Sequence, residues 1–159
     1  MSVDTTVIGK QTGAWRVALD RSVLANFAAA VCDRSPVYRA AAAAAPPTFT
    51  FAAPYWSTMS TDDQPADPTA GGANPMHTIM GDLFAQGALV LHGEQEFEYH
   101  RTPVAGDVLD GLQTITDIYE KTTDTAHMTF VVMETQWSDA RDGSPVVTER
   151  FNLIARLKR

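Results

Sequence analysis

The stretch "LHGEQEFEYHRTPVAGDVL" (residues 91–109) carries the clearest local pattern in the chain. In its first half, three glutamates alternate with Gln95, Phe97 and Tyr99, which is the period of a β-strand with one polar face. "PVAGDV" then reads as a turn, and the chain continues into the strand-like "LQTITDIYEK" at 112–121. Residues 91–121 therefore predict two successive strands.

Two further strands are predicted downstream. "HMTFVVMETQW" (127–137) and "PVVTERFNLIARLKR" (145–159) are rich in β-branched and aromatic residues, and the turn-forming "SDARDGS" separates them. Four strands in sequence favour an antiparallel meander. Residues 127–137 are apolar on both faces, so we expect a helix to cover one face and another subunit or domain to cover the other.

A helix is predicted near the N-terminus. A short alternating apolar piece ends at Leu19, and Asp20 follows as a good N-cap. Apolar residues from Val23 to Val31 then repeat at helical spacing. Pro36 disfavours helical geometry at the residue before it, so the helix should end a few residues earlier.

The segment "APPTFTFAAPYW" (45–56) is ambiguous between helix and strand. Its paired prolines suit the first turn of a helix, whereas Phe49 and Phe51 alternate as they would in a strand. An alanine run separates this segment from the first helix, so we expect it, rather than that helix, to lie in the concave face of the sheet. Helical spacing of apolar residues predicts another short helix at 76–86.

One folded domain is expected. The length of 159 residues fits a single domain, which we place at 14–157 after an N-terminal tail at 1–13. The polar stretch 57–75 contains three prolines and two adjacent glycines and is predicted to be a flexible loop insertion.

Charge and composition narrow the class of protein. The formal net charge is −7 with only 12 Lys and Arg, which argues against a nucleic-acid or anionic-membrane partner. The single cysteine excludes an internal disulfide, and no signal peptide or membrane span is evident. A cytoplasmic location is the resulting expectation.

Candidate chemistry is concentrated at few positions. Asp33 and Tyr38 lie in "CDRSPVY" (32–38), and they read either as a helix-ending turn or as a remnant acid–base pair, because a phenol is a poor base at neutral pH. His92 and Glu94, two apart at a strand start, are a second possible pair. No metal-ligand spacing and no cofactor motif is present, so neither a metal nor a cofactor is expected.

An aromatic cluster provides a candidate binding surface. The segment before the long loop contains four large rings within eight residues. They could line a pocket for an acyl chain, and core packing would explain them equally well. The four candidates are Phe49, Phe51, Tyr55 and Trp56.

Together these segments resemble a known family. The order "CDRSPVY", "APPTFTF", "LHGEQEFEYHRTPVAGDVL", "DIYEK" and "MTFVVMETQW" is similar to the N-terminal domain of the MaoC-like dehydratases. That resemblance implies an α+β hot-dog fold, in which an antiparallel sheet wraps around a central helix. The family includes the (R)-specific enoyl-CoA hydratases and the actinobacterial (3R)-hydroxyacyl-ACP dehydratases.

The resemblance gives "CDRSPVY" a meaning. The family's catalytic motif is G-D-x-N-P-x-H, and Asp33 and Pro36 match it. Cys32 stands in place of the glycine, Ser35 in place of the asparagine and Tyr38 in place of the catalytic histidine. The motif is therefore degenerate, and its base is missing.

The resemblance also implies a partner. In two-subunit dehydratases of this kind one subunit keeps the acid–base pair and the other holds the acyl chain, and this sequence is similar to the second. We expect it to bind an acyl-CoA or acyl-ACP thioester in fatty acid metabolism and to form a heterodimer with a catalytic MaoC-like subunit. An active homodimeric hydratase that uses Asp33 with Tyr38, or His92 with Glu94, is the first alternative, and a non-enzymatic acyl-CoA-binding or structural module is the second.

Overall fold

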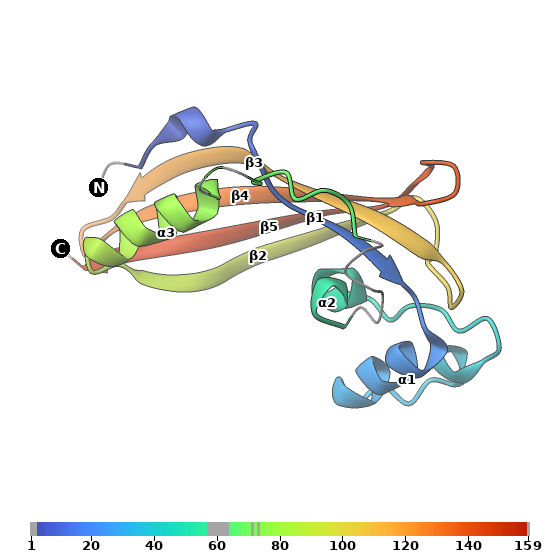
Figure 1. The fold of residues 1–159 in the computed structure, drawn as a ribbon. Coiled ribbons are helices and arrows are strands. Elements are labelled where there is room, and N and C mark those ends of the chain that lie inside the picture. The colour runs from blue at the N-terminus through green and yellow to red at the C-terminus, as the bar shows by residue number, and fades with distance from the viewer. Residues whose placement is uncertain (1–2, 57–63, 71, 73, 159) are drawn as a thin grey trace.

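A single antiparallel sheet dominates the molecule (Figure 1). The computed structural model describes residues 3–56, 64–70, 72 and 74–158. The five strands are paired in the order β1-β3-β4-β5-β2. Their bounds are β1 Gln11–Ala18, β2 Leu89–Tyr99, β3 Val108–Thr122, β4 Ala126–Asp139 and β5 Pro145–Lys158.

The predicted meander is correct for β3, β4 and β5 and wrong for β2. β2 pairs with β5, and β3 takes β1 as its other neighbour. The segment 100–107 is therefore a crossover from one side of the sheet to the other and not a hairpin turn. Its backbone bonds to other parts of the chain, since the N–H of Gly106 donates to the carbonyl of Leu19 at 2.8 Å.

The helices begin where the capping residues predict. The side chain of Asp20 accepts a hydrogen bond from the N–H of Ser22, and that of Asn74 accepts one from the N–H of Met76. The ambiguous segment forms a helix, and Pro54 lies inside it. The helices are α1 Arg21–Ala30, α2 Phe49–Trp56 and α3 Pro75–Ala85, with short 3₁₀ turns η1 at Thr5–Val7 and η2 at Pro36–Arg39.

Two helices cover the concave face of the sheet. Figure 1 shows α3 over one end of the strands and α2 near the other, with α1 beyond α2. The predicted α+β architecture, an antiparallel sheet around a helical layer, is confirmed, and that layer is divided between α2 and α3. None of the helices in the described ranges is long and apolar enough to cross a membrane.

The core is divided in the same way. One buried cluster joins α1 and α2 to the sheet and includes Leu24, Phe49 and Trp137. The other lies beneath α3 and includes Leu83 and Val131. Burial of such side chains stabilises the fold by about 1.5–3 kcal/mol each. The two clusters therefore anchor the two helical pieces separately.

Residues outside the two clusters complete the frame. Val7, in the segment predicted to be a tail, is buried in the cluster beneath α3, and β1 begins at Gln11. In the predicted loop 57–75, residues 57–63, 71 and 73 lie outside the described residues. The neighbouring Gln64 accepts a hydrogen bond from the N–H of Arg16 in β1 at 2.8 Å and donates one to its carbonyl at 2.8 Å.

Candidate functional site

The "CDRSPVY" turn closes helix α1. The N–H of Cys32 donates to the carbonyl of Ala29 at 3.0 Å, and that of Asp33 donates to the carbonyl of Ala28 at 2.8 Å. These two bonds form a Schellman arrangement, whose left-handed position is usually a glycine. Cys32 takes that position with φ 61°. Cys32 therefore occupies a backbone position that favours glycine, the residue that the family motif has here.

Asp33 and Tyr38 lie together in this turn. Oδ1 of Asp33 accepts a hydrogen bond from the N–H of Ser35 at 2.9 Å. Burial, together with the charge and hydrogen bonding of Asp33, raises the pKa of Tyr38 above its ordinary value of 10.0. The phenol therefore stays protonated at neutral pH and is unable to act as a general base. Among the described residues, no hydrogen bond or ion pair joins a histidine to Asp33.

A second tyrosine reaches the same place from β2. The hydroxyl of Tyr99 accepts a hydrogen bond from the N–H of Thr48 at 3.3 Å, immediately before α2. The pKa of Tyr99 is raised, chiefly by burial, with the Thr48 bond opposing the shift and the charges of Glu149 and Tyr38 adding to it. The motif turn, the end of β2 and the start of α2 therefore meet at one point.

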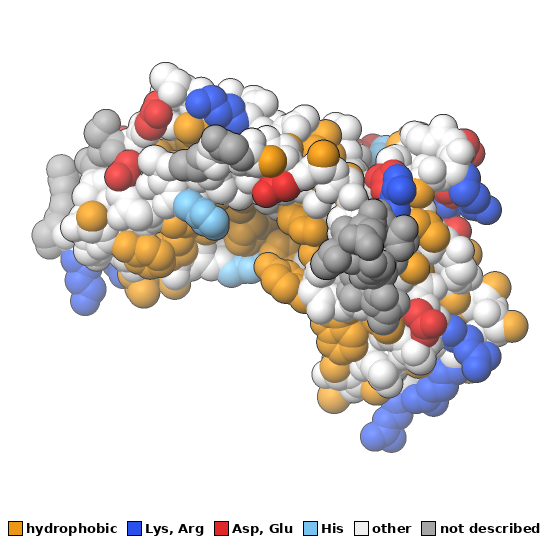
Figure 2. Space-filling view, viewed as in Figure 1, with side chains coloured by type: hydrophobic (Ala, Val, Ile, Leu, Met, Phe, Trp, Pro, Cys, Tyr) orange, Lys and Arg blue, Asp and Glu red, His pale blue; other side chains and the backbone are white. Residues whose placement is uncertain are grey.

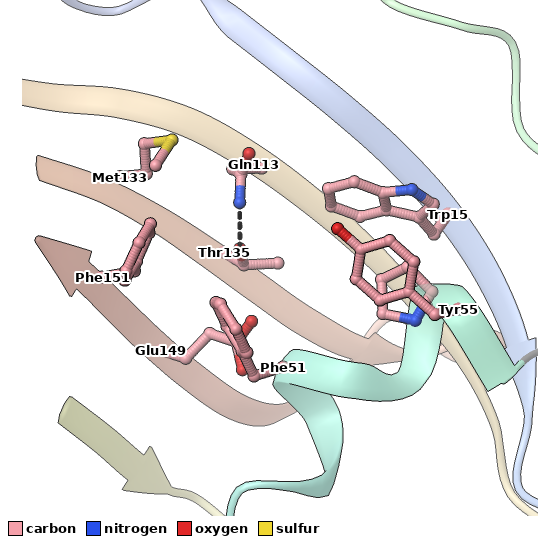
Figure 3. A pocket seen from close by; sticks show the side chains of 9 residues that line it. Trp15, Phe51, Tyr55, Gln113, Met133, Thr135, Glu149 and Phe151 are labelled. Carbon is pink, nitrogen blue, oxygen red and sulfur yellow. Dashed lines mark hydrogen bonds between the residues drawn. The ribbon is translucent and has the colours of Figure 1, made fainter. Parts of the chain in front are cut away.

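A pocket lies beside this point, on the concave face of the sheet. Figure 2 shows the surface hollowed between α3 and α2, with hydrophobic side chains lining the hollow. The pocket has a volume of about 280 Å³. It is lined by Trp15 from β1, Phe51, Pro54 and Tyr55 from α2, Gln113 from β3, Met133 and Thr135 from β4, and Glu149 and Phe151 from β5. Figure 3 shows the labelled side chains around it.

The structure divides the predicted aromatic cluster in two. Phe51 and Tyr55 line the pocket. Phe49 is 2% exposed and meets the ring of Phe27 edge-on, with 5.2 Å between centroids. Trp56 also packs edge-on against Phe27, at 6.0 Å. One face of α2 therefore holds α1, and the other face is available to a ligand.

The structure does not join His92 to Glu94. A β-bulge interrupts the pairing of β2 with β5 between His92 and Gln95, so the simple alternation behind that prediction is lost. The imidazole of His92 packs against Phe51 and Phe151, with centroids 5.6 and 4.5 Å away. Within the described ranges, no group of three or more His, Cys, Asp or Glu residues is arranged to hold a metal ion.

Glu149 is the site residue that the sequence interpretation missed. Its side chain lines the pocket although the residue is only 4% exposed. Oε2 accepts a hydrogen bond from the hydroxyl of Thr50 at 2.8 Å. Burial raises the pKa of Glu149 above its ordinary value of 4.5, and the bond from Thr50 opposes this shift. Strand alternation with Val147 and Phe151 was the available signal, because it places Glu149 on the inward face.

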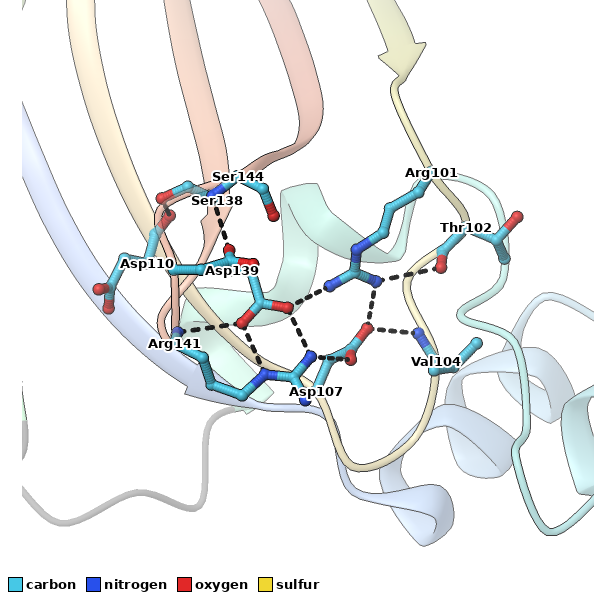
Figure 4. A network of polar contacts seen from close by, with 10 residues as sticks. Arg101, Thr102, Val104, Asp107, Asp110, Ser138, Asp139, Arg141 and Ser144 are labelled. Atoms are coloured by element: carbon cyan, nitrogen blue, oxygen red, sulfur yellow. Dashed lines mark hydrogen bonds and ion pairs between the residues drawn. The ribbon is translucent and has the colours of Figure 1, made fainter.

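An ionic network fixes the crossover that leads to β3 (Figure 4). Arg101 bonds to Asp107 at 2.5 Å and to Asp139 at 2.8 Å, and Arg141 bonds to Asp139 at 2.7 Å. The hydrogen bonds from Arg141, aided by that from Arg101, hold the pKa of Asp139 well below its usual range. These contacts join the crossover to the hairpin between β4 and β5.

The fixed crossover in turn supports the chain before α2. The N–H of Ala45 donates to the carbonyl of Pro103 at 2.8 Å, and the N–H of Ala105 donates to the carbonyl of Ala43 at 2.8 Å. The segment between the motif turn and α2 is therefore held against the sheet on a rigid support. The residues of the ionic network support this segment, but none of them lines the pocket.

Comparison with known families assigns this architecture. The model of the FAS1-like dehydratase domain region matches residues 6–149. The chain belongs to this dehydratase family. A UPF0336 protein of Saccharopolyspora erythraea is 32% identical to this chain over 168 residues, covering 98% of this chain and 93% of that protein.

Solved structures share the fold. The HadBC (3R)-hydroxyacyl-ACP dehydratase complex of Mycobacterium tuberculosis contains a chain with a TM-score of 0.62 and 20% identity, covering 97% of this chain and 99% of that one. A MaoC-like dehydratase from Phytophthora capsici has a TM-score of 0.66 and 21% identity, over 97% of this chain and 49% of that one. The hot-dog fold is thus confirmed, and with it the resemblance of this chain to the MaoC-like dehydratases in fold.

Proposed function

We propose that this chain is the acyl-thioester-binding subunit of a two-chain hydratase or dehydratase, and that a MaoC-like partner supplies the catalytic groups. The observation that supports this most directly is the pairing of Asp33 with a neutral phenol where the family motif has an imidazole. A tyrosine hydroxyl with a raised pKa does not take a proton at neutral pH. Without that imidazole, the motif turn of this chain lacks the histidine that would accept a proton when water adds across an enoyl double bond.

The pocket supports a role in binding the acyl chain of the substrate. Phe51 and Tyr55 offer apolar walls, and Met133 and Phe151 continue the apolar surface along the sheet. An acyl chain is the kind of ligand that gains from such a surface, since each buried methylene contributes about 0.8 kcal/mol.

The edges of the sheet support a partner on one side. On the β1 edge, the backbone of Arg16 is bonded to Gln64, and the carbonyl of Thr12 accepts the side-chain N–H of Asn74 at 2.8 Å. Among the described residues β2 has no such cap, and Leu89 on it is 57% exposed. An uncapped strand of this length is a surface that proteins normally cover. We propose that the partner pairs along β2.

The test is hydration of crotonyl-CoA, followed by the loss of enoyl absorbance. The chain alone should show a kcat below about 1 s⁻¹, the low end of ordinary enzymes. Co-expression with a MaoC-like chain that carries an intact G-D-x-N-P-x-H should produce a complex with full activity. In that complex Asp33→Asn and Tyr38→Phe should leave kcat within about twofold, whereas loss of the partner's motif histidine should abolish hydration.

The outcomes separate the alternatives. Activity of the isolated chain that disappears in Asp33→Asn would instead make it an active homodimer. Acyl-CoA binding without hydration, alone and with every partner tried, would make it a binding or structural module.

A further inference from the structure

A row of polar side chains crosses the concave face between the two hydrophobic clusters. Gln113, Thr135 and Glu149 stand opposite one another on β3, β4 and β5. The amide N–H of Gln113 donates to the hydroxyl of Thr135 at 3.2 Å, and the hydroxyl of Thr12 donates to the Gln113 carbonyl oxygen at 2.9 Å. Thr50 of α2 completes the row through its bond to Glu149 at 2.8 Å.

The row interrupts a face that is otherwise apolar. On β4, Thr135 lies between Met133 of one cluster and Trp137 of the other, and Glu149 interrupts β5 in the same way. Thr135 and Glu149 are both buried. Burying such groups costs free energy unless hydrogen bonds compensate, so a polar row kept in this position calls for a reason.

The row forms part of the pocket wall and keeps hydrogen-bonding capacity. Gln113, Thr135 and Glu149 all line the pocket, beside Phe51 and Tyr55 (Figure 3). Glu149 offers four lone pairs on two carboxyl oxygens; the hydroxyl of Thr50 uses one, Trp137 and Thr135 also donate towards the carboxyl group, and capacity for one further donor remains. Gln113 uses one of its two amide hydrogens in the bond to Thr135. An occupant of the pocket would therefore meet both an acceptor and a donor.

We infer that this pocket selects an acyl thioester that carries a hydroxyl group well beyond C3 of its acyl chain, where the hydroxyl bonds to Glu149 and Gln113. The inference rests on the proposed acyl-binding function and names the substrate class of the same pocket. A hydroxyl both donates and accepts, so it pairs with Glu149 as donor and with Gln113 as acceptor. An ammonium group has no lone pair for Gln113, and a plain alkyl chain would use neither the remaining lone pair of Glu149 nor the second amide hydrogen of Gln113.

The size of the pocket sets the probes. Its volume of about 280 Å³ is nearly twice that of a 150 Å³ apolar cavity that admits benzene. A chain of medium length therefore fits. Suitable probes are decanoyl-CoA and three derivatives of it that are hydroxylated at C6, C8 or C10.

Isothermal titration of the full-length chain with these four thioesters tests the inference. At least one hydroxylated probe should bind about tenfold or more tightly than decanoyl-CoA, as expected for one hydrogen bond to a charged or buried group. Glu149→Leu should remove that preference while keeping the affinity for decanoyl-CoA, and Glu149→Gln should reduce it. Asp124→Asn, an exposed carboxylate in the β3–β4 turn, is the matched control and should change neither affinity.

The possible failures are distinct. Equal affinity for plain and hydroxylated chains would overturn this inference and leave acyl binding intact. A preference that survives in a folded Glu149→Leu variant, checked by its thermal midpoint, would also overturn it. Binding of none of the four probes would overturn both this inference and the proposed acyl-binding function.

Discussion

Replacing Tyr38 by histidine should leave the isolated chain a very weak hydratase. The substitution supplies an imidazole beside Asp33, and a positioned acid–base group contributes about 10²–10⁴-fold. The carboxylate, however, is already bonded to the N–H of Ser35 at 2.9 Å, and a catalytic group misplaced by about 1 Å loses about 10²-fold. The two effects are similar in size, so we expect the single variant to gain little.

The backbone conformation of Cys32 gives the change in stability expected for Cys32→Gly. Cys32 has φ 61°, and a left-handed backbone costs a residue other than glycine about 1–2 kcal/mol. Glycine removes this cost but adds back about 0.4–1 kcal/mol through the entropy of the unfolded chain. Cys32→Gly should therefore stabilise the protein by about 1 kcal/mol, which is a rise of about 2–4 °C in Tm.

The triple variant Cys32→Gly, Ser35→Asn, Tyr38→His combines these changes. Asparagine orders turns by bonding its own backbone, so the triple variant should exceed the single one in kcat. The assay is crotonyl-CoA hydration by the partner-free chain, with Tm measured in parallel. Two results would refute the reasoning: a wild-type kcat above about 1 s⁻¹, or loss of a wild-type activity in Tyr38→Phe.

Four further predictions concern stability and assembly. Phe49→Ala should cost about 3–5 kcal/mol, whereas Tyr55→Ala, at a residue 86% exposed, should stay within about 0.5 kcal/mol; equal Tm values for the two would contradict the packing described. Because the pKa of Asp139 is depressed, its stabilisation is present above its ordinary pKa of 3.8 and lost as pH falls, so Asp139→Asn should flatten the fall of Tm in acid. The pKa of Glu149 is raised, so the stability tied to it is greatest below pH 4.5 and is lost as pH rises through the folded-state pKa; the gain in Tm from Glu149→Gln should therefore be larger at pH 7 than at pH 4. The chain should self-associate at micromolar concentration, and Leu91→Lys on the exposed edge should shift its light-scattering mass towards the monomer.

Local signals in the sequence were enough for much of the fold. The cap at Asp20, the alternation around Phe97 and the turn between β4 and β5 each depend on neighbouring residues. The pairing of β2 with β5 does not depend on neighbouring residues. It depends on the hydrogen bonds that the 100–107 crossover makes with distant parts of the chain. An alternating pattern identifies a strand but does not show which strand it pairs with. The prediction that β2 pairs with β3, the next strand in the sequence, was therefore wrong.

The candidate site shows the same division. The helix-ending turn around Asp33 followed from Pro36, its interpretation as a degenerate motif came from the family resemblance, and half of the aromatic cluster lines the pocket. In the helix, Phe49 and Phe51 point to different sides, whereas in a strand they would share one face. Because the sequence did not decide between helix and strand, it could not predict that only Phe51 lines the pocket. Glu149 was overlooked because a glutamate in a strand is usually taken as a solvated residue, whereas its cross-strand partner Thr135 and the hydroxyl of Thr50 bury it.

The difference between the two sheet edges has a consequence for stoichiometry. A sheet with two free edges adds chains without end, since each addition presents a new edge. Here Gln64 and Asn74 occupy backbone groups on the β1 side, so pairing along β2 would consume the uncapped edge of each chain. Growth would then stop after one addition. The side chains that cap β1 would thus act as chain terminators, and the assembly would remain a discrete pair at concentrations where a sheet open on both sides would form fibres.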